Sequence, residues 1–220
     1  MEKTKTSGSP RSTTLATTTL IACLTLGVAA LAMVPFGEVR AGEAFVQGPA
    51  GAAFYDPPQS LEPGRHGDLI WATPLATSVP NAKAWKILYW STTTDNKTVP
   101  VSGLLIAPAG DPPAAGRPVV TWGHGTSGSS RNCAPSLAAD PARDANFYFM
   151  PDSAADYDYG VPGLSRMIEA GYVVVASDYN GLGGPGVHQY LISDTEGRNV
   201  STPPSPRAGS RPPGRATGRS

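Results

Sequence analysis

The sequence has little cysteine, with Cys23 and Cys133 as its only two. Cys23 lies in an apolar N-terminal run that we expect to be cleaved off, so the mature chain would keep Cys133 alone. An exported chain with one cysteine holds either an unpaired thiol or half of a pair whose partner is missing. A catalytic cysteine is not favoured, because the run Cys-Ala-Pro-Ser that begins at Cys133 shows no turn that would activate a nucleophile.

The sequence also has no excess of charge of either sign, with 17 Lys and Arg against 17 Asp and Glu. Residues 42–200 are mildly acidic, because they carry 15 acidic residues against 9 basic ones. A nucleic-acid-binding surface needs clustered positive charge. We therefore expect no nucleic-acid partner.

Motifs for phosphate, dinucleotide and calcium binding are missing as well. The glycine-rich run 181–184 lacks the Lys and Ser or Thr of a phosphate loop and the spacing of a dinucleotide fingerprint. Asp152, Asp156 and Asp158 lack the glycine and the glutamate that complete an EF-hand loop, so a solvated loop is the favoured interpretation. We predict neither a cofactor nor a metal site.

Residues 1–41 have the features of an export signal. A basic start with Lys3, Lys5 and Arg11 precedes an apolar run at 15–34, and small residues at the −3 and −1 positions, 39 and 41, suit cleavage after Ala41. We therefore predict a secreted protein that contacts the membrane only transiently, through this signal. The alternative is a membrane anchor at 15–34, but threonines interrupt that run.

Residues 201–220 have the composition of a disordered tail. They contain only Ser, Thr, Pro, Arg, Ala and Gly, with five prolines and four arginines. Such a segment cannot bury a core.

The body, residues 42–200, reads as an α/β domain. We expect an extended N-terminal arm with Phe54 and Tyr55 to pack on it. A hairpin is followed by a strand, a helix and an unbroken apolar strand, which is typical of a crossover between parallel strands. The expected strands are 70–75, 84–92, 99–107, 118–122 and 172–177, and the crossover helix is 162–170.

The strand at 118–122 breaks into Gly-His-Gly-Thr-Ser-Gly at 123–128. Ligands of open α/β sheets bind where strands end, and a glycine lets a backbone N–H approach an oxyanion. His124, Gly125 and Thr126 are therefore candidates for an oxyanion hole. The alternative is a tight turn with no ligand.

Several segments around this loop occur in an order that resembles the secretory lipase family of α/β-hydrolases, over roughly residues 53–200. They are Phe-Tyr-Asp-Pro-Pro at 54–58, Pro-Gly-Arg-His-Gly-Asp-Leu-Ile at 63–70, Val-Ser-Gly at 101–103, Pro-Ala-Gly at 108–110, Gly-His-Gly-Thr at 123–126, Gly-Tyr-Val-Val-Val-Ala-Ser-Asp-Tyr at 171–179, Gly-Leu-Gly at 181–183 and Gly-Val-His at 186–188. The resemblance implies a secreted carboxylic ester hydrolase that acts on lipids through a Ser-Asp-His triad. It also implies a helix from about residue 194 that leads to the nucleophile strand, with Asp194 or Thr195 as its cap.

The sequence contains no Gly-x-Ser-x-Gly, the elbow that holds the nucleophile in this family. Ser165 lies in the expected helix, and Asp178 and His188 come too early in the chain for the order Ser, Asp, His. We expect the N-terminal part of an α/β-hydrolase with an incomplete sheet and no activity of its own, with a reading-frame shift after about Val200. The alternative is an exported, non-catalytic binding protein whose basic tail is functional.

Overall fold

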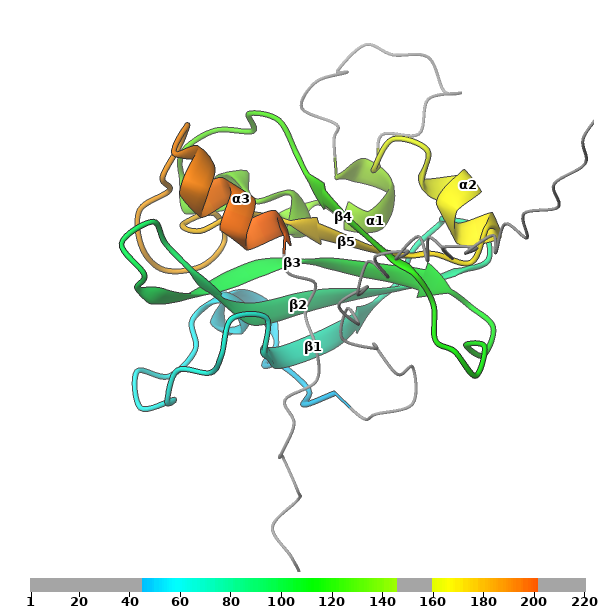
Figure 1. The fold of residues 1–220 in the computed structure, drawn as a ribbon, viewed down its shortest axis with the longest axis horizontal. Coiled ribbons are helices and arrows are strands. Elements are labelled where there is room, and N and C mark those ends of the chain that lie inside the picture. The colour runs from blue at the N-terminus through cyan, green and yellow to red at the C-terminus, as the bar shows by residue number, and fades with distance from the viewer. Residues whose placement is uncertain (1–44, 146–159, 202–220) are drawn as a thin grey trace, which may run out of the picture. The chain divides into compact units, whose positions relative to one another are not determined.

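The computed structural model describes residues 45–145 and 160–201 of the 220-residue chain. A mixed sheet of five strands runs in the order β1-β2-β3-β5-β4 (Figure 1). The strands are β1 Leu69–Leu75, β2 Ala82–Thr92, β3 Thr98–Pro108, β4 Val119–Gly123 and β5 Val173–Ser177. β1, β2, β3 and β5 pair antiparallel, and β4 pairs parallel with β5. The predicted α/β class and the hairpin of β2 and β3 are confirmed.

Within the described residues, three short α-helices accompany the sheet: α1 Pro141–Asp144, α2 Leu164–Glu169 and α3 Ser193–Ser201. α2 is the predicted crossover helix. The predicted extended arm is wrong in part, because Gly51–Tyr55 forms a 3-10 helix that buries Phe54 and Tyr55. Two further 3-10 turns, Arg131–Cys133 and Pro135–Leu137, follow β4.

The predicted cap of the last helix is also wrong. α3 begins at Ser193, so Asp194 and Thr195 lie in its first turn. The physical reason is that Glu196 reaches back and accepts a hydrogen bond from the backbone N–H of Leu191 at 3.3 Å. A carboxylate that bonds a free N–H before the helix takes the place of a capping side chain.

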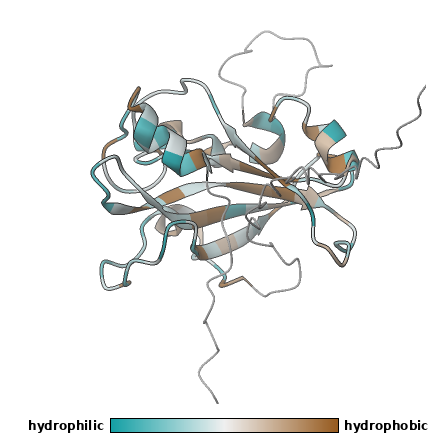
Figure 2. Ribbon diagram, in the orientation of Figure 1, coloured by the Kyte–Doolittle hydropathy of each residue, from teal (hydrophilic) through white to brown (hydrophobic). Residues whose placement is uncertain are grey.

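The sheet buries both of its faces. Successive residues of β3 point to opposite sides, so Leu104 and Ile106 join Leu164 of α2 in one cluster while Leu105 joins Tyr89 in the other. α3 lies on the Tyr89 side, where the Tyr89 hydroxyl donates to the backbone carbonyl of Asn199 at 2.6 Å. Figure 2 shows the hydrophobic residues gathered in the strands, with α3 largely hydrophilic.

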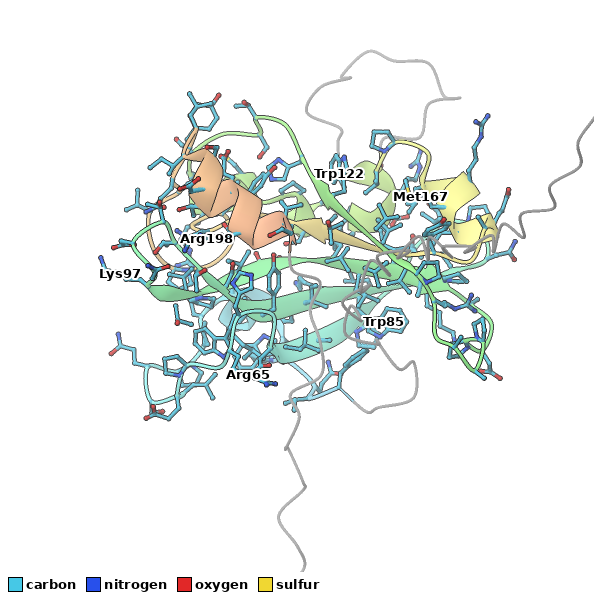
Figure 3. All side chains as sticks on the ribbon, in the orientation of Figure 1. Arg65, Trp85, Lys97, Trp122, Met167 and Arg198 are labelled. Carbon is cyan, nitrogen blue, oxygen red and sulfur yellow. The ribbon has the colours of Figure 1, made fainter. Side chains whose placement is uncertain are left out.

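α3 is fastened to the β2–β3 hairpin by Arg198. Its guanidinium donates to the carbonyl of Thr93 at 2.9 Å and to the side-chain oxygen of Asn96 at 2.7 Å. Figure 3 shows Arg198 directed toward the hairpin end that carries Lys97. Residues far apart in the sequence are therefore joined at this end of the sheet.

Several predictions fall outside the described residues. These are the export signal, the tail, and the acidic cluster of Asp152, Asp156 and Asp158. The predicted start of the tail is wrong by one residue, because Ser201 is the last residue of α3. Within residues 45–145 and 160–201, no helix is long and apolar enough to cross a membrane.

Candidate oxyanion-binding site

The carboxyl ends of β4 and β5 meet at one edge of the sheet, because Gly123 of β4 is paired with Ser177 of β5. The chain leaves β4 at His124, which is buried, and continues through Gly125 and Thr126, which are exposed. The backbone N–H groups of Gly125 and Thr126 donate to no group in the part of the chain that the structure describes. Two consecutive backbone donors without a partner in the described residues therefore lie in an exposed loop, at the edge where ligands of α/β sheets bind.

The side chain of His124 is buried, so it is not placed as a solvent-exposed general base. Its ring lies between Trp122 and Tyr179, with ring centroids 6.3 and 4.8 Å away. Nδ1 is 2.5 Å from the carbonyl oxygen of Gly125, and Nε2 is 3.4 Å from that of Asp178. Both ring nitrogens therefore lie beside backbone carbonyl oxygens, and the tautomer decides which of them donates. The histidine thus contacts the loop's own backbone.

Tyr179 contacts the loop from the end of β5. Its hydroxyl donates to the backbone carbonyl of His124 at 3.0 Å. Burial raises the pKa of this phenol, and the charge of Glu196 raises it further, so the hydroxyl stays protonated and remains a donor at neutral pH. A Cβ at Gly123 would lie 2.3 Å from the hydroxyl oxygen, which explains why glycine ends β4.

A second tyrosine touches the loop from outside. The hydroxyl of Tyr190 is 2.9 Å from the side-chain hydroxyl of Thr126. Tyr190 is 46% exposed and stands beside Leu191, which is 76% exposed, and Val187, which is 82% exposed. The segment that follows β5 therefore places apolar surface next to the candidate donors.

Asp178 is fully buried and holds another part of the site. Its carboxylate accepts hydrogen bonds from the backbone N–H of Ser136 at 3.0 Å and from the hydroxyls of Ser136 at 2.5 Å and Ser102 at 2.6 Å. Burial raises the pKa of the carboxyl above its ordinary value of 3.8, although these hydrogen bonds act in the opposite direction. Asp178 ties the 3-10 turns after β4 to the sheet.

The other histidines are engaged elsewhere. His188 approaches the backbone carbonyl of Asn180 with Nδ1 at 3.0 Å, and its ring lies 6.2 Å from that of Tyr179. His66 has Nδ1 at 3.3 Å from the hydroxyl of Thr92, and burial lowers its pKa, with the charge of Arg198 adding to the effect. Each of these histidines has a local structural contact.

The described residues contain no group of three His, Cys, Asp or Glu side chains that could hold a metal ion. Cys133 carries a free thiol. A Cβ at Gly128, whose φ is +129°, would lie 2.4 Å from the thiol sulfur, so Cys133 packs directly on the backbone of the loop.

The sequence placed His124, Gly125 and Thr126 at the end of a strand. It did not indicate that Tyr179 bonds the backbone of this loop, or that Tyr190 contacts the Thr126 side chain. Tyr179 could have been found, because it is the second residue after a strand that was expected to lie parallel to β4. Tyr190 gives no such signal, because it lies in an irregular segment whose path the sequence does not specify.

Comparisons with known proteins give structural likenesses only. No protein-family model matches the chain, and no curated protein matches it. The rice cell wall degrading esterase LipA from Xanthomonas oryzae is 24% identical with a TM-score of 0.44, over 63% of this chain and 36% of that one. Candida antarctica lipase A in its closed state is 20% identical with a TM-score of 0.44, over 62% of this chain and 30% of that one. The chain thus matches only about a third of the length of these structures.

Proposed function

We propose that this chain carries the oxyanion-binding part of a carboxylic ester hydrolase of the lipase and esterase type. The observation that carries the proposal is the pair of backbone N–H groups of the exposed residues Gly125 and Thr126, which donate to no group in the described part of the chain. Attack on an ester places negative charge on the carbonyl oxygen, and donors fixed beforehand stabilise that charge. Removal of one such donor typically costs about 3–4 kcal/mol of transition-state stabilisation.

The resemblance to secretory lipases supports a water-insoluble lipid ester as the substrate of the whole enzyme. In that family a serine attacks the ester, a histidine carries the proton and an aspartate orients the histidine. Within this sequence no Gly-x-Ser-x-Gly supplies the serine. The carboxylate of Asp178 accepts hydrogen bonds from Ser102 and Ser136, and the ring of His188 contacts the backbone carbonyl of Asn180, so neither side chain is placed to serve a triad. We therefore expect the 220-residue chain to bind an oxyanion without hydrolysing esters.

The test is an NMR titration of the isotopically labelled 220-residue chain with butanoate, whose carboxylate mimics the charged oxygen. We expect the amide resonances of Gly125 and Thr126 to shift in a saturable manner, since their N–H groups would bond the carboxylate. An exposed glycine beyond the opposite end of the strands, Gly110 after β3, serves as the internal control and should not respond. Unmoved resonances at both loop positions would contradict the proposal.

Hydrolysis provides the second test. We expect no release of nitrophenol from p-nitrophenyl butanoate above the spontaneous rate, because the nucleophile is missing. Hydrolysis by the purified chain that disappears on substitution of a single serine would overturn this part of the proposal.

Export is part of the same proposal. The sequence supports a secreted protein cleaved after Ala41, against a chain anchored by residues 15–34. Mass spectrometry of the protein from the culture medium of its host should find Gly42 at the N-terminus. An intact N-terminus in the membrane fraction would favour the anchor.

A non-catalytic exported protein with a functional basic tail would be favoured if residues 201–220 were found in the native protein and the loop did not bind butanoate.

A further inference from the structure

The direction of the Gly125 N–H depends on what holds the peptide group before it. That peptide joins the carbonyl of His124 to the N–H of Gly125, and in a trans peptide these two groups point in opposite directions. The hydroxyl of Tyr179 donates to the His124 carbonyl at 3.0 Å. A hydrogen bond on one side of the peptide plane thus fixes the donor on its other side.

We propose that Tyr179 is a positioning residue, whose hydroxyl holds the His124–Gly125 peptide so that the N–H of Gly125 points away from the sheet toward a bound oxyanion. This inference rests on the proposed function of the loop. It assigns to Tyr179 a role that acts through the backbone, without contact between Tyr179 and the substrate.

The backbone of Tyr179 is held in a conformation that a side chain seldom adopts. Its φ is +67°, in the left-handed region that disfavours residues with a Cβ. The N–H of Tyr179 donates to the hydroxyl oxygen of Ser177 at 3.0 Å, and the Tyr179 ring lies 4.8 Å from the ring of His124. Strain of this kind persists only where the surroundings over-determine the geometry, and it gathers at functional sites.

Space for the hydroxyl is provided by Gly123. A Cβ at this position would approach the Tyr179 oxygen to 2.3 Å, which is closer than any real contact. The glycine has no positive φ, so the close approach of the phenol is the reason for its presence. Gly123 and Tyr179 therefore act as a pair.

The two candidate donors are held by different groups, and this allows the inference to be tested at each one. The carbonyl of Gly125 belongs to the peptide that carries the Thr126 N–H, and it lies 2.5 Å from Nδ1 of His124. Loss of the Tyr179 hydroxyl should therefore disturb the Gly125 N–H more than that of Thr126. A general loosening of the fold would affect both alike.

The experiment compares Tyr179→Phe with the unchanged 220-residue chain in the butanoate titration. We expect the affinity for butanoate to fall roughly fivefold, as for the loss of one ordinary hydrogen bond. The carbonyl carbon resonance of His124 should shift, and the response of the Gly125 amide should shrink more than that of Thr126. p-Aminophenylalanine at position 179 keeps an N–H donor and should restore the response.

The matched control is Tyr190→Phe, which removes a hydroxyl that contacts the Thr126 side chain rather than a carbonyl. It should leave the affinity and the His124 carbonyl resonance unchanged. Gly123→Ala is a second route to the same effect, because its methyl group would displace the phenol while Tyr179 remains. It should reproduce the weaker binding, which keeps the inference testable if Tyr179→Phe does not fold.

The outcomes separate the two proposals. If the unchanged chain binds butanoate through both amides and Tyr179→Phe binds it equally well, the positioning role is overturned while the proposed function stands. If the unchanged chain shows no response at Gly125 and Thr126, the proposed function itself fails. An equal loss for Tyr179→Phe and Tyr190→Phe would also overturn the inference, since it would show no specificity for the carbonyl contact.

Discussion

At the scale of single residues, Gly181 shows how tightly the segment after β5 is packed. Its φ is +80°, and an added Cβ would lie 2.3 Å from the backbone nitrogen of His188. We expect Gly181→Ala to lower the free energy of unfolding by roughly 2–4 kcal/mol, through left-handed strain and the forced movement of backbone. Urea unfolding of the purified variant measures the change.

The matched control for Gly181 is Gly197, in the middle of α3. It is exposed, its φ is not positive, and an added Cβ would meet no atom within 4 Å. Gly197→Ala should raise the free energy of unfolding by about 0.5–1 kcal/mol, because alanine loses less backbone entropy in a helix. Equal effects of the two substitutions would show that the packing around Gly181 has been misjudged.

The sequence predicted the position of the candidate donors better than their support. A short apolar strand followed by Gly-His-Gly-Thr is a local pattern, and it placed His124, Gly125 and Thr126 at the edge of the sheet. The contacts of Tyr179 and Tyr190 with these residues span 55 and 64 positions of sequence. Such contacts depend on tertiary packing and on a positive φ at Tyr179, which no pattern in the sequence indicates.

At the scale of elements, α3 is held by its two buried side chains, Thr195 and Asn199. A nine-residue helix is marginal without tertiary contacts. Asn199 is 1% exposed, and its amide donates to the hydroxyl of Ser91 at 2.8 Å and accepts from the N–H of Asn180 at 2.9 Å. We expect Asn199→Ala to lower the free energy of unfolding by about 2–4 kcal/mol, since both partners would stay buried and unpaired.

Arg198 is the control on the same helix. It makes two hydrogen bonds to the hairpin at a less buried site, so Arg198→Ala should lower the free energy of unfolding by only about 1 kcal/mol. Hydrogen exchange of the α3 amides would measure both variants. A larger effect of Arg198→Ala than of Asn199→Ala would place the anchor of α3 at the hairpin instead.

The elements that the sequence specified best are those with strong local signals. The hairpin of β2 and β3 and the crossover through α2 to β5 follow from β-branched runs and from one apolar helix face. The 3-10 helix at Gly51–Tyr55 and the start of α3 were predicted wrongly. Both depend on contacts that a local pattern does not contain, namely the burial of Phe54 against Trp71 and the bond between Glu196 and the N–H of Leu191.

At the scale of the whole molecule, Asp178 makes stability depend on pH. Burial raises the pKa of its carboxyl in the folded state above the ordinary value of 3.8. Between pH 3.8 and the raised pKa, the folded chain holds a proton on Asp178 that the unfolded chain has released. The stability that this proton binding contributes is fully present below pH 3.8 and is lost as pH rises through the raised pKa. Acidification from about pH 7 to about pH 4.5 should thus increase the stability of the unchanged chain relative to Asp178→Asn, which cannot titrate.

Asp140 provides the control, because its pKa is shifted the other way. Its burial acts to raise the pKa, but hydrogen bonds from the N–H and hydroxyl of Ser78, both at 2.7 Å, lower it overall. Its contribution is therefore present above pH 3.8 and lost only as pH falls below that value, so the difference between the unchanged chain and Asp140→Asn should be flat from about pH 7 to about pH 4.5. Urea unfolding across this range measures all three proteins. Parallel stability curves for the unchanged chain and Asp178→Asn would contradict the prediction, since the carboxyl would then have the same pKa in the folded and the unfolded chain. In that case the hydrogen bonds from Ser102 and Ser136 would offset the effect of burial on the pKa in full.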